Sequence, residues 1–571
     1  MRASAFVSSV ALAVASVSLA DIFQLYDCDG DGSLLLTELD AVPGVDLSGL
    51  YLGCADLDGE NLSGADLSEC DLSFSYLFDS NFSNANLTGA NLLSANIRNS
   101  DFEDAVLDDT QATLNSFINF RNARMLNAVL DTESTHFIND LVMEGADFSG
   151  SSLLGTNGSY PESYFSGSNF RNANMTNSLL RKVWFTDTFS KATSDFRNTN
   201  FSNATFDQCY FRTADFTNAN LTGAISLGTR WEFCDFTDVD FSSFSSKKID
   251  SFYETSISQS LLTGVNLTNA ELTDVVLGGI TSGNIQGVPA SLPENWVLVN
   301  GYLVGPSAIV SGADFSFQDF SAQNFSGANF QSTNLEGANF LNSVLFGINL
   351  EFADAESADF SNTTLINAYL EFADFEDSNF SNANLTNSKL SFANICGANF
   401  TRADLSSSSL VSVDFCDAIL IETNFQNANM VGVSLASRDL SGLNFSSADL
   451  SYSDLRFADF TNADLSNANL TGVNIYQANL YGADLSGAIL DGVDLSVAVF
   501  IPPVTGSCCV SSGCTTNSEA ECTELGGTWT EGGFCDECSS APSSCAADLS
   551  GDGIVGFDDL VNVISNWGVC P

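Results

Sequence analysis

The sequence predicts an all-β fold built as a four-sided solenoid, and three observations lead to this prediction. Between residues 315 and 500 every fifth residue is Phe, Leu, Ile or Met, with the single exception of Ala355. The residue two places before each of them is usually small, and the residue directly before it is usually Asn or Asp. A helix face returns every 3.6 residues and a strand face every two, so a period of five belongs to a larger repeating unit.

Five residues can form one side of a square coil, so that four sides return the chain above its starting point after about 20 residues, one strand spacing of about 4.8 Å higher. The large residue and the small one two places before it then point inward, while Asn, Asp, Ser and Thr face water. The register weakens in 108–160 and 243–260, where we expect irregular coils or loops. Earlier stretches keep the period over Leu47–Leu107, Phe165–Phe185, Phe196–Phe241 and Leu262–Leu277.

The pentapeptides "SGANF", "TNANL" and "SGADL" closely resemble those of the pentapeptide-repeat family over about residues 47–500. The resemblance implies a right-handed quadrilateral β-helix. It also raises the alternative of a DNA-mimicking, topoisomerase-binding protein, because some members of the family act in that way.

The composition is strongly acidic. The chain has 571 residues, 17 Lys and Arg against 71 Asp and Glu, and a formal charge of −54. Such a surface repels nucleic acid and attracts cations. Residues 1–20 read as a secretory signal peptide ahead of Asp21, so we expect a secreted or cell-surface protein with no membrane span. The 15 Cys fit an oxidising compartment.

The segment "DCDGDGSLLLTE", residues 27–38, resembles the calcium loop of an EF-hand. Short carboxylates fall at positions 1, 3 and 5, a glycine at the turn, a backbone carbonyl at position 7 and a Glu at position 12, which is the ligand set that Ca²⁺ requires. The flanking segments "DIFQLY" and "LDAV" are expected to form short helical turns. The predicted ligands are Asp27, Asp29, Asp31, Ser33 and Glu38.

A second calcium loop is predicted in "DLSGDGIVGFDDL", residues 548–560. It resembles half of a dockerin, a module that docks onto cohesins, and is followed by a segment that resembles a short helix. Dockerins carry two such repeats and this chain shows one, so the resemblance supports calcium binding more than docking. The predicted ligands are Asp548, Ser550, Asp552, Ile554 through its carbonyl, and Asp559.

Two further features are local. Alternating apolar residues around Asn300-Gly301 predict a β-hairpin near 295–305 that plugs the solenoid between two blocks. Cys396 and Cys416 are 20 residues apart, so a coil of four pentapeptides stacks them and predicts a disulfide or a close thiol pair. Cys209 and Cys234 would meet only if a five-residue bulge lay between them.

The predicted organisation has seven parts. They are a signal peptide (1–20), an EF-hand-like motif (21–44), a first β-helix block that is irregular in places (45–285), a β-hairpin insert (286–311), a second β-helix block (312–502), a disulfide-rich module (503–540) and a dockerin-like calcium repeat (541–571).

The first functional hypothesis is an exported, non-catalytic, calcium-binding rod that acts in structure, display, adhesion or protein interaction. Its partners would be calcium and an extracellular or cell-surface protein or matrix component. The alternative is an extracellular enzyme acting on polysaccharide. Such an enzyme would need a groove in the mixed region 108–260, which contains Arg121, Arg124, Arg181, Lys182 and Trp184. His136 is the only histidine, so a histidine-based nucleophilic site would have to use it, and it lies in an irregular stretch.

Overall fold

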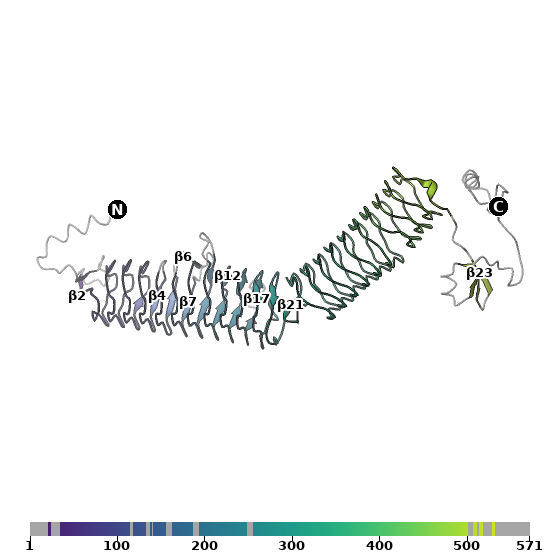
Figure 1. The fold of residues 1–571 in the computed structure, drawn as a ribbon. Helices are drawn as coiled ribbons and strands as arrows, with labels where there is room; N and C mark the ends of the chain where they lie inside the picture. Colours follow the sequence, from purple (N-terminus) through teal and green to yellow (C-terminus); the bar gives the residue numbers. More distant parts are fainter. Residues whose placement is uncertain are drawn as a thin grey trace, which may run out of the picture.

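The protein is a long solenoid that bends near the strand β21 (Figure 1). The structure is a computed structural model in which the strands are short, and turns and single β-bridges make up most of the chain. The residues that it describes are 21–23, 35–114, 118–132, 137–139, 141–155, 163–186, 193–247, 255–500, 506–510, 513–517 and 528–530.

Each regular coil has four sides. Asp314, Asp319, Asn324 and Asn329 each form a parallel bridge with the residue one coil later, Asn334, Asn339, Val344 and Asn349 respectively. The side chain of Asn339 also donates a hydrogen bond of 3.0 Å to Asp319, 20 residues earlier. The predicted four-sided, all-β solenoid is therefore confirmed.

We name the four sides after the outward residues of the first coil. Face 1 contains Asp46, face 2 Tyr51, face 3 Asp56 and face 4 Asn61, and each of these residues pairs with its equivalent in the next coil. Face 4 continues without a break into the second block, where Thr281 pairs with Ile309 and Ile309 with Asn329. The two blocks thus form one continuous column.

The core is the column of large residues at every fifth position. Phe360, Phe380 and Phe400 are fully buried and stack in successive coils, with ring centroids 5.0 Å apart. Burying each such side chain stabilises the fold by roughly 1.5–3 kcal/mol. The backbone turns at each corner through a left-handed residue, as at Asn382 with a φ of 57°. Asn adopts this conformation more readily than most residues, which explains its frequency there.

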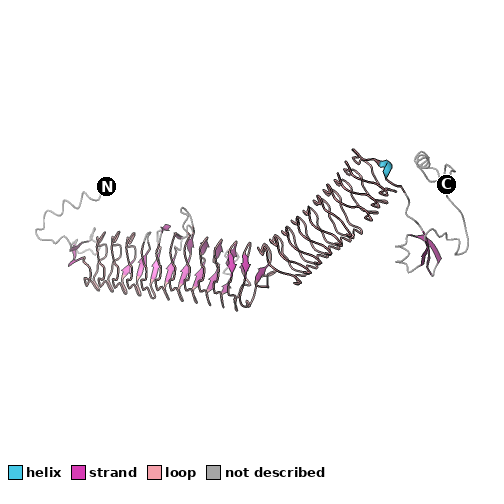
Figure 2. Ribbon diagram, viewed as in Figure 1, coloured by secondary structure: helices cyan, strands magenta, loops and turns pink. Residues whose placement is uncertain are grey.

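Regular strands gather in the first block, whereas the second block consists of turns and single bridges (Figure 2). Face 2 carries an eight-stranded parallel sheet. Its strands are β3 (Asn91–Leu92), β4 (Gln111–Thr113), β5 (Val129–Asp131), β7 (Ser152–Leu154), β9 (Leu179–Arg181), β11 (Thr205–Asp207), β13 (Ile225–Leu227) and β15 (Ser245–Lys247).

Face 3 carries a seven-stranded parallel sheet, and two further strands pair on face 4. The strands of face 3 are β6 (Phe137–Asn139), β8 (Ser163–Ser166), β10 (Val183–Phe185), β12 (Tyr210–Arg212), β14 (Arg230–Glu232), β16 (Thr255–Ser258) and β18 (Val275–Val276). Those of face 4 are β17 (Leu261–Thr263) and β19 (Thr281–Gly283).

The coils depart from twenty residues in the region where the sequence period weakens. On face 1, Arg124 pairs with Asp147 and Asp147 with Asn174, while on face 4 Asp235 pairs with Leu261. The four faces nevertheless persist, because β5, β7, β15 and β16 keep their places in the sheets. The column of buried core residues therefore continues through the irregular coils.

The predicted hairpin is confirmed and lies at the junction of the two blocks. Strands β20 (Val297–Val299) and β21 (Tyr302–Val304) pair in antiparallel fashion. Leu303 is fully buried, and its amide donates to the hydroxyl of Ser282 at 2.9 Å. On the other side Asn300 donates to the carbonyl of Asp314 at 3.0 Å. The hairpin therefore fills the junction and is bonded to both blocks.

The expectation of helical turns around the first calcium loop was wrong. Asp21–Phe23 forms β1 and Leu35–Asp40 forms β2, and the two strands pair in antiparallel fashion. Segments this short cannot nucleate a helix on their own, whereas pairing satisfies their backbone groups. Ile22 is buried with the first coil, so the strand pair covers the N-terminal end of the core.

The C-terminal part of the described chain has a short 3₁₀ helix and a small sheet. The helix, η1 (Leu495–Val497), is capped by Asp494 at the last coil. Strands β22 (Gly506–Val510), β23 (Gly513–Asn517) and β24 (Thr528–Thr530) form an antiparallel sheet within the predicted Cys-rich module. The helix predicted beyond residue 541 lies outside the described residues.

Candidate functional site

The residues predicted to bind calcium fall almost entirely outside the described part of the chain. Of the first loop, Glu38 lies in strand β2, whose backbone pairs with β1. The remaining predicted ligands, Asp27, Asp29, Asp31, Ser33, Asp548, Ser550, Asp552, Ile554 and Asp559, lie outside the described residues.

Within the described ranges, no group of three or more His, Cys, Asp or Glu side chains is arranged to hold a metal ion. The same ranges contain no helix that is long and apolar enough to pass through a bilayer.

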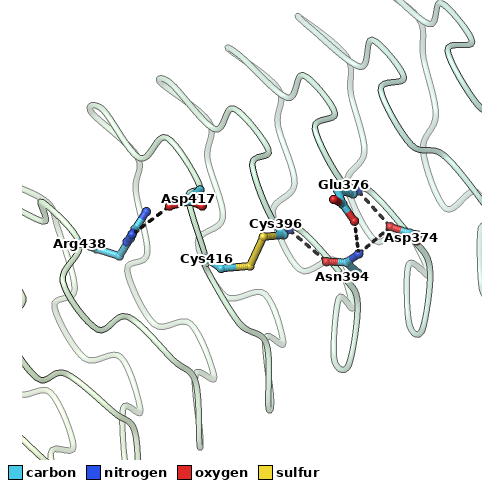
Figure 3. The surroundings of a disulfide bond; sticks show 7 residues. All are labelled: Asp374, Glu376, Asn394, Cys396, Cys416, Asp417 and Arg438. Atoms are coloured by element: carbon cyan, nitrogen blue, oxygen red, sulfur yellow. Dashed lines mark hydrogen bonds and ion pairs between the residues drawn. A yellow bond between two sulfur atoms is a disulfide. The ribbon is translucent and has the colours of Figure 1, made fainter.

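The predicted pairing of Cys396 and Cys416 is confirmed. The two residues form a disulfide between neighbouring coils, with a Cα–Cα distance of 4.8 Å (Figure 3). The other suggested pair does not form: Cys209 and Cys234 are both buried free thiols. No bulge shifts the register between them. Cys209 directly precedes Tyr210 of face 3, whereas Cys234 directly precedes Asp235 of face 4, so the two thiols lie on different sides of the coil. Burial raises the pKa of each thiol to about 12.

The second block carries a strip of carboxylates along face 1 and the corner that follows it. Glu336, Glu356 and Glu376 occupy the same corner in successive coils, and Asp354 and Asp374 lie on the adjoining face. We call these five residues the acidic strip. Desolvation and then repulsion from its four neighbours raise the pKa of the Glu356 carboxyl. The strip thus concentrates like charges that the regular coil stacks one above another.

All four basic residues of this block are already engaged. Arg402 pairs with Glu422 at 2.7 Å, Arg438 with Asp417 at 3.3 Å and Arg456 with Asp454 at 2.7 Å. The Lys389 ammonium lies 4.5 Å from the centroid of the Tyr369 ring. No described cation pairs with a carboxylate of the acidic strip. Its negative charge is therefore available to cations in solution or on a partner.

An exposed aromatic row borders the acidic strip. Phe352, Phe372 and Phe392 are each about half exposed, at the corner between faces 4 and 1. Their rings stack in parallel, with centroids 5.1 and 5.2 Å apart. All three residues have positive φ, which bulky residues rarely adopt. This stripe of apolar ring edges gives the block a second surface for interaction beside the charged one.

The basic residues named for a catalytic groove do not converge. Arg121 pairs with Glu144 at 2.9 Å, Arg124 with Asp108 at 2.5 Å and Arg181 with Asp207 at 2.7 Å. Arg121 lies at the corner that follows face 4, Arg124 lies on face 1 and Arg181 lies on face 2. The three side chains are therefore on different sides of the solenoid. Trp184 lies on face 3 with different neighbours, and these residues build no common active-site groove.

Comparison with known proteins agrees with this architecture. A family model described as pentapeptide repeats matches more than half of the chain, at residues 44–73, 75–110, 142–187, 194–225, 324–362, 343–382, 363–402, 398–435, 439–475 and 478–501. A comparison with curated proteins finds no match.

Solved structures of pentapeptide repeat proteins are also similar to the chain. HetL, a regulator of heterocyst differentiation from the cyanobacterium Nostoc, is 25% identical over 43% of this chain and 89% of its own, with a TM-score of 0.19. Rfr23 from the cyanobacterium Cyanothece is 26% identical over 19% of this chain and 90% of its own, with a TM-score of 0.19. A thylakoid-lumen protein of Arabidopsis thaliana is 30% identical over 16% of this chain and 65% of its own, with a TM-score of 0.16. The family assignment rests on the sequence model together with the four-sided coil: the chain belongs to the pentapeptide repeat family.

Proposed function

We propose that this protein is an exported, non-catalytic rod that presents an acidic surface to a partner outside the cell. The continuous solenoid supports a rigid body, because face 4 runs through the hairpin junction without losing its pairing. The acidic strip, whose carboxylates face no described cation, is the observation that carries the proposal.

Calcium is the proposed cofactor, bound at the two terminal loops. Both loops have the oxygen ligands and the spacing that Ca²⁺ prefers, and in the sequence one loop precedes the solenoid and the other follows it. In this view calcium neutralises the clustered carboxylates and orders the ends, so attachment to a cell-surface or matrix partner depends on the ion.

Calorimetric titration of the full chain with CaCl₂ tests this proposal. One variant combines Asp27→Asn with Asp29→Asn, and a second combines Asp548→Asn with Asp552→Asn. The control combines Glu336→Gln, Glu356→Gln and Glu376→Gln in the acidic strip. We expect each loop variant to lose one site and the control to keep both. A wild-type chain with no site tighter than about 1 mM, the weak limit of extracellular calcium modules, would refute calcium-dependent attachment.

The second candidate is the DNA-mimicking topoisomerase binder, which the negative charge of the second block favours. The predicted signal peptide argues against it, because it would take the chain away from such a target. Cell fractionation separates the two proposals: we expect the protein outside the cytoplasm. A cytoplasmic protein that inhibited DNA supercoiling by a purified gyrase would replace the first proposal with the second.

A further inference from the structure

Face 3 of the first block carries a row of outward aromatic residues. Tyr164 of β8, Trp184 of β10 and Tyr210 of β12 are direct neighbours in the parallel sheet. Their ring centroids are 5.3 and 5.2 Å apart, and each residue is partly exposed. The row runs along the rod across three coils, and one of its strands, β12, is labelled in Figure 1. Over the four faces together, the residue at this outward position is most often Asn or Asp, so three successive aromatic residues are a departure from the repeat.

The ring geometry of this row differs from that of the exposed phenylalanines in the second block. Successive rings are nearly perpendicular, at 77° and 79°, whereas Phe352, Phe372 and Phe392 are parallel to within 6°. In a parallel stack each inner ring has both faces covered by its neighbours. In a perpendicular pair only one ring can turn its face to the other. In the pair Trp184 and Tyr210, at least one ring therefore does not turn its face to the other, and a flat ligand can stack on that face.

Positive charge adjoins the same row. Arg230 of β14 pairs with Tyr210 through the backbone, and Arg212 lies on the same strand as Tyr210. Both arginines are exposed, and neither forms an ion pair with a described carboxylate. Their charges act on the Tyr210 hydroxyl, which donates a hydrogen bond of 2.7 Å to Glu232. Arg212 is also held 5.6 Å from the ring centroid of Phe233.

These features form one surface, which we call the face 3 patch: Tyr164, Trp184, Tyr210, Arg212 and Arg230. In a chain with a formal charge of −54, two exposed guanidinium groups that pair with no described carboxylate, beside partly exposed aromatic rings, indicate a ligand that is itself anionic. The ligand must also offer flat apolar faces, because a ligand bound by charge alone would not stack on the ring of Trp184.

We propose that the face 3 patch binds an acidic polysaccharide, a chain of uronic acid units that lies along the rod. Sugar rings present apolar C–H faces that stack on aromatic side chains. Their carboxylates can accept hydrogen bonds from the guanidinium groups of Arg212 and Arg230, because Arg binds carboxylates in a bidentate manner. An extended β-1,4-linked chain advances per sugar by a distance similar to the spacing of the row. The proposal goes beyond the calcium-dependent rod and identifies a matrix component that the rod could contact.

The charge of the whole protein favours a glycan over a nucleic acid. A duplex carries one negative charge for every 1.7 Å or so of its axis, and the surrounding acidic coils would repel it strongly. A uronic acid chain carries one charge per sugar at a wider spacing. It can place its carboxylates on the two arginines while its apolar ring faces cover the aromatic row.

The test is calorimetric titration of the full chain with two hexasaccharides of the same β-1,4 linkage, one of glucuronate and one of glucose. We expect the glucuronate hexasaccharide to bind at least about tenfold more tightly than the glucose one, and added salt to weaken it. Trp184→Ala is expected to weaken binding of both sugars. Arg212→Gln combined with Arg230→Gln is expected to remove the preference for glucuronate.

The controls are Phe372→Ala, an exposed aromatic residue whose row is parallel, and Arg402→Gln, an exposed arginine that is ion-paired. Both should bind like the wild type, and thermal melting should show that all variants fold. The proposal is overturned if neither sugar binds, if glucose binds as tightly as glucuronate, or if the controls weaken binding as much as the patch variants. A single-stranded oligonucleotide that competes as well as glucuronate would also overturn it, because recognition would then be by charge alone.

Discussion

Two phenylalanines eight positions apart separate the contribution of burial from that of ring stacking. Phe380 and Phe372 each stack in parallel between two phenylalanines of neighbouring coils, with centroids 5.0–5.2 Å apart. Phe380 is fully buried in the core, whereas Phe372 is 51% exposed at a corner. Truncation of a buried Phe to Ala costs about 3–5 kcal/mol, because apolar contacts are lost and a cavity remains. Stacked aromatic pairs alone contribute about 0.5–1.5 kcal/mol each.

We therefore expect Phe380→Ala to destabilise the second block by about 3–5 kcal/mol and Phe372→Ala by less than about 2 kcal/mol. Because each coil contacts mainly its neighbours, the effect should be local. Native-state hydrogen exchange of the backbone amides of residues 360–400 measures the loss of local stability for both variants. Equal losses would refute the assignment of every fifth residue to the core. A Phe380→Ala variant as well protected as the wild type would do the same.

Three further predictions follow from other parts of the rod. Replacing both Cys396 and Cys416 by Ser should lower the stability of the second block by about 3 kcal/mol, as expected for a closed loop of this length, and a urea titration followed by circular dichroism measures it. Leu303→Ala should cost about 2–5 kcal/mol and increase amide exchange on both sides of the hairpin, because Leu303 is fully buried between the blocks. Burial raises the pKa of Cys70 to about 11 and that of Cys209 to about 12, from an ordinary value of 9.0. The unfolded thiols ionise first, so their contribution to stability is complete below pH 9 and is lost as the pH rises through about 11–12, which denaturant titrations from pH 8 upward should show.

The sequence period was sufficient to predict the core of this protein. Once five residues form one side of a coil, the side chain of a residue such as Phe380 must point into the core. The same arithmetic placed Cys396 beside Cys416. Asn300-Gly301 was an independent local signal, and it located the hairpin. These predictions succeeded because each depends on spacing within a regular stretch or on a single turn.

The error at the N-terminal strand pair and the omission of the aromatic row have a different cause, because both lie where the period is absent or interrupted. Trp184 and Tyr210 are 26 residues apart rather than 20, so spacing alone does not reveal that they lie in one row with Tyr164. Pairing of Asp21–Phe23 with β2 is likewise a long-range contact, and local sequence could not distinguish it from a helical turn. One signal was available: Tyr164, Trp184 and Tyr210 each stand directly before a core Phe, where the repeat usually has Asn or Asp.

The fold separates what maintains the solenoid from what this protein can recognise. Inward positions are fixed by the coil, since a polar residue there would be buried without a partner. Outward positions have no such constraint, and a side chain repeated at one of them forms a line along the rod. The phenylalanines of the second block occupy left-handed corner positions that favour Asn or Gly, so packing of the core does not explain them. The same reasoning applies to the aromatic row on face 3, which replaces residues that normally bond with the coil above. Both rows depart from the repeat, and neither adds to the buried core. One row places bulky residues in left-handed backbone conformations, and the other replaces side chains that hydrogen-bond to the next coil. Such departures are the places where we expect this rod to recognise a partner.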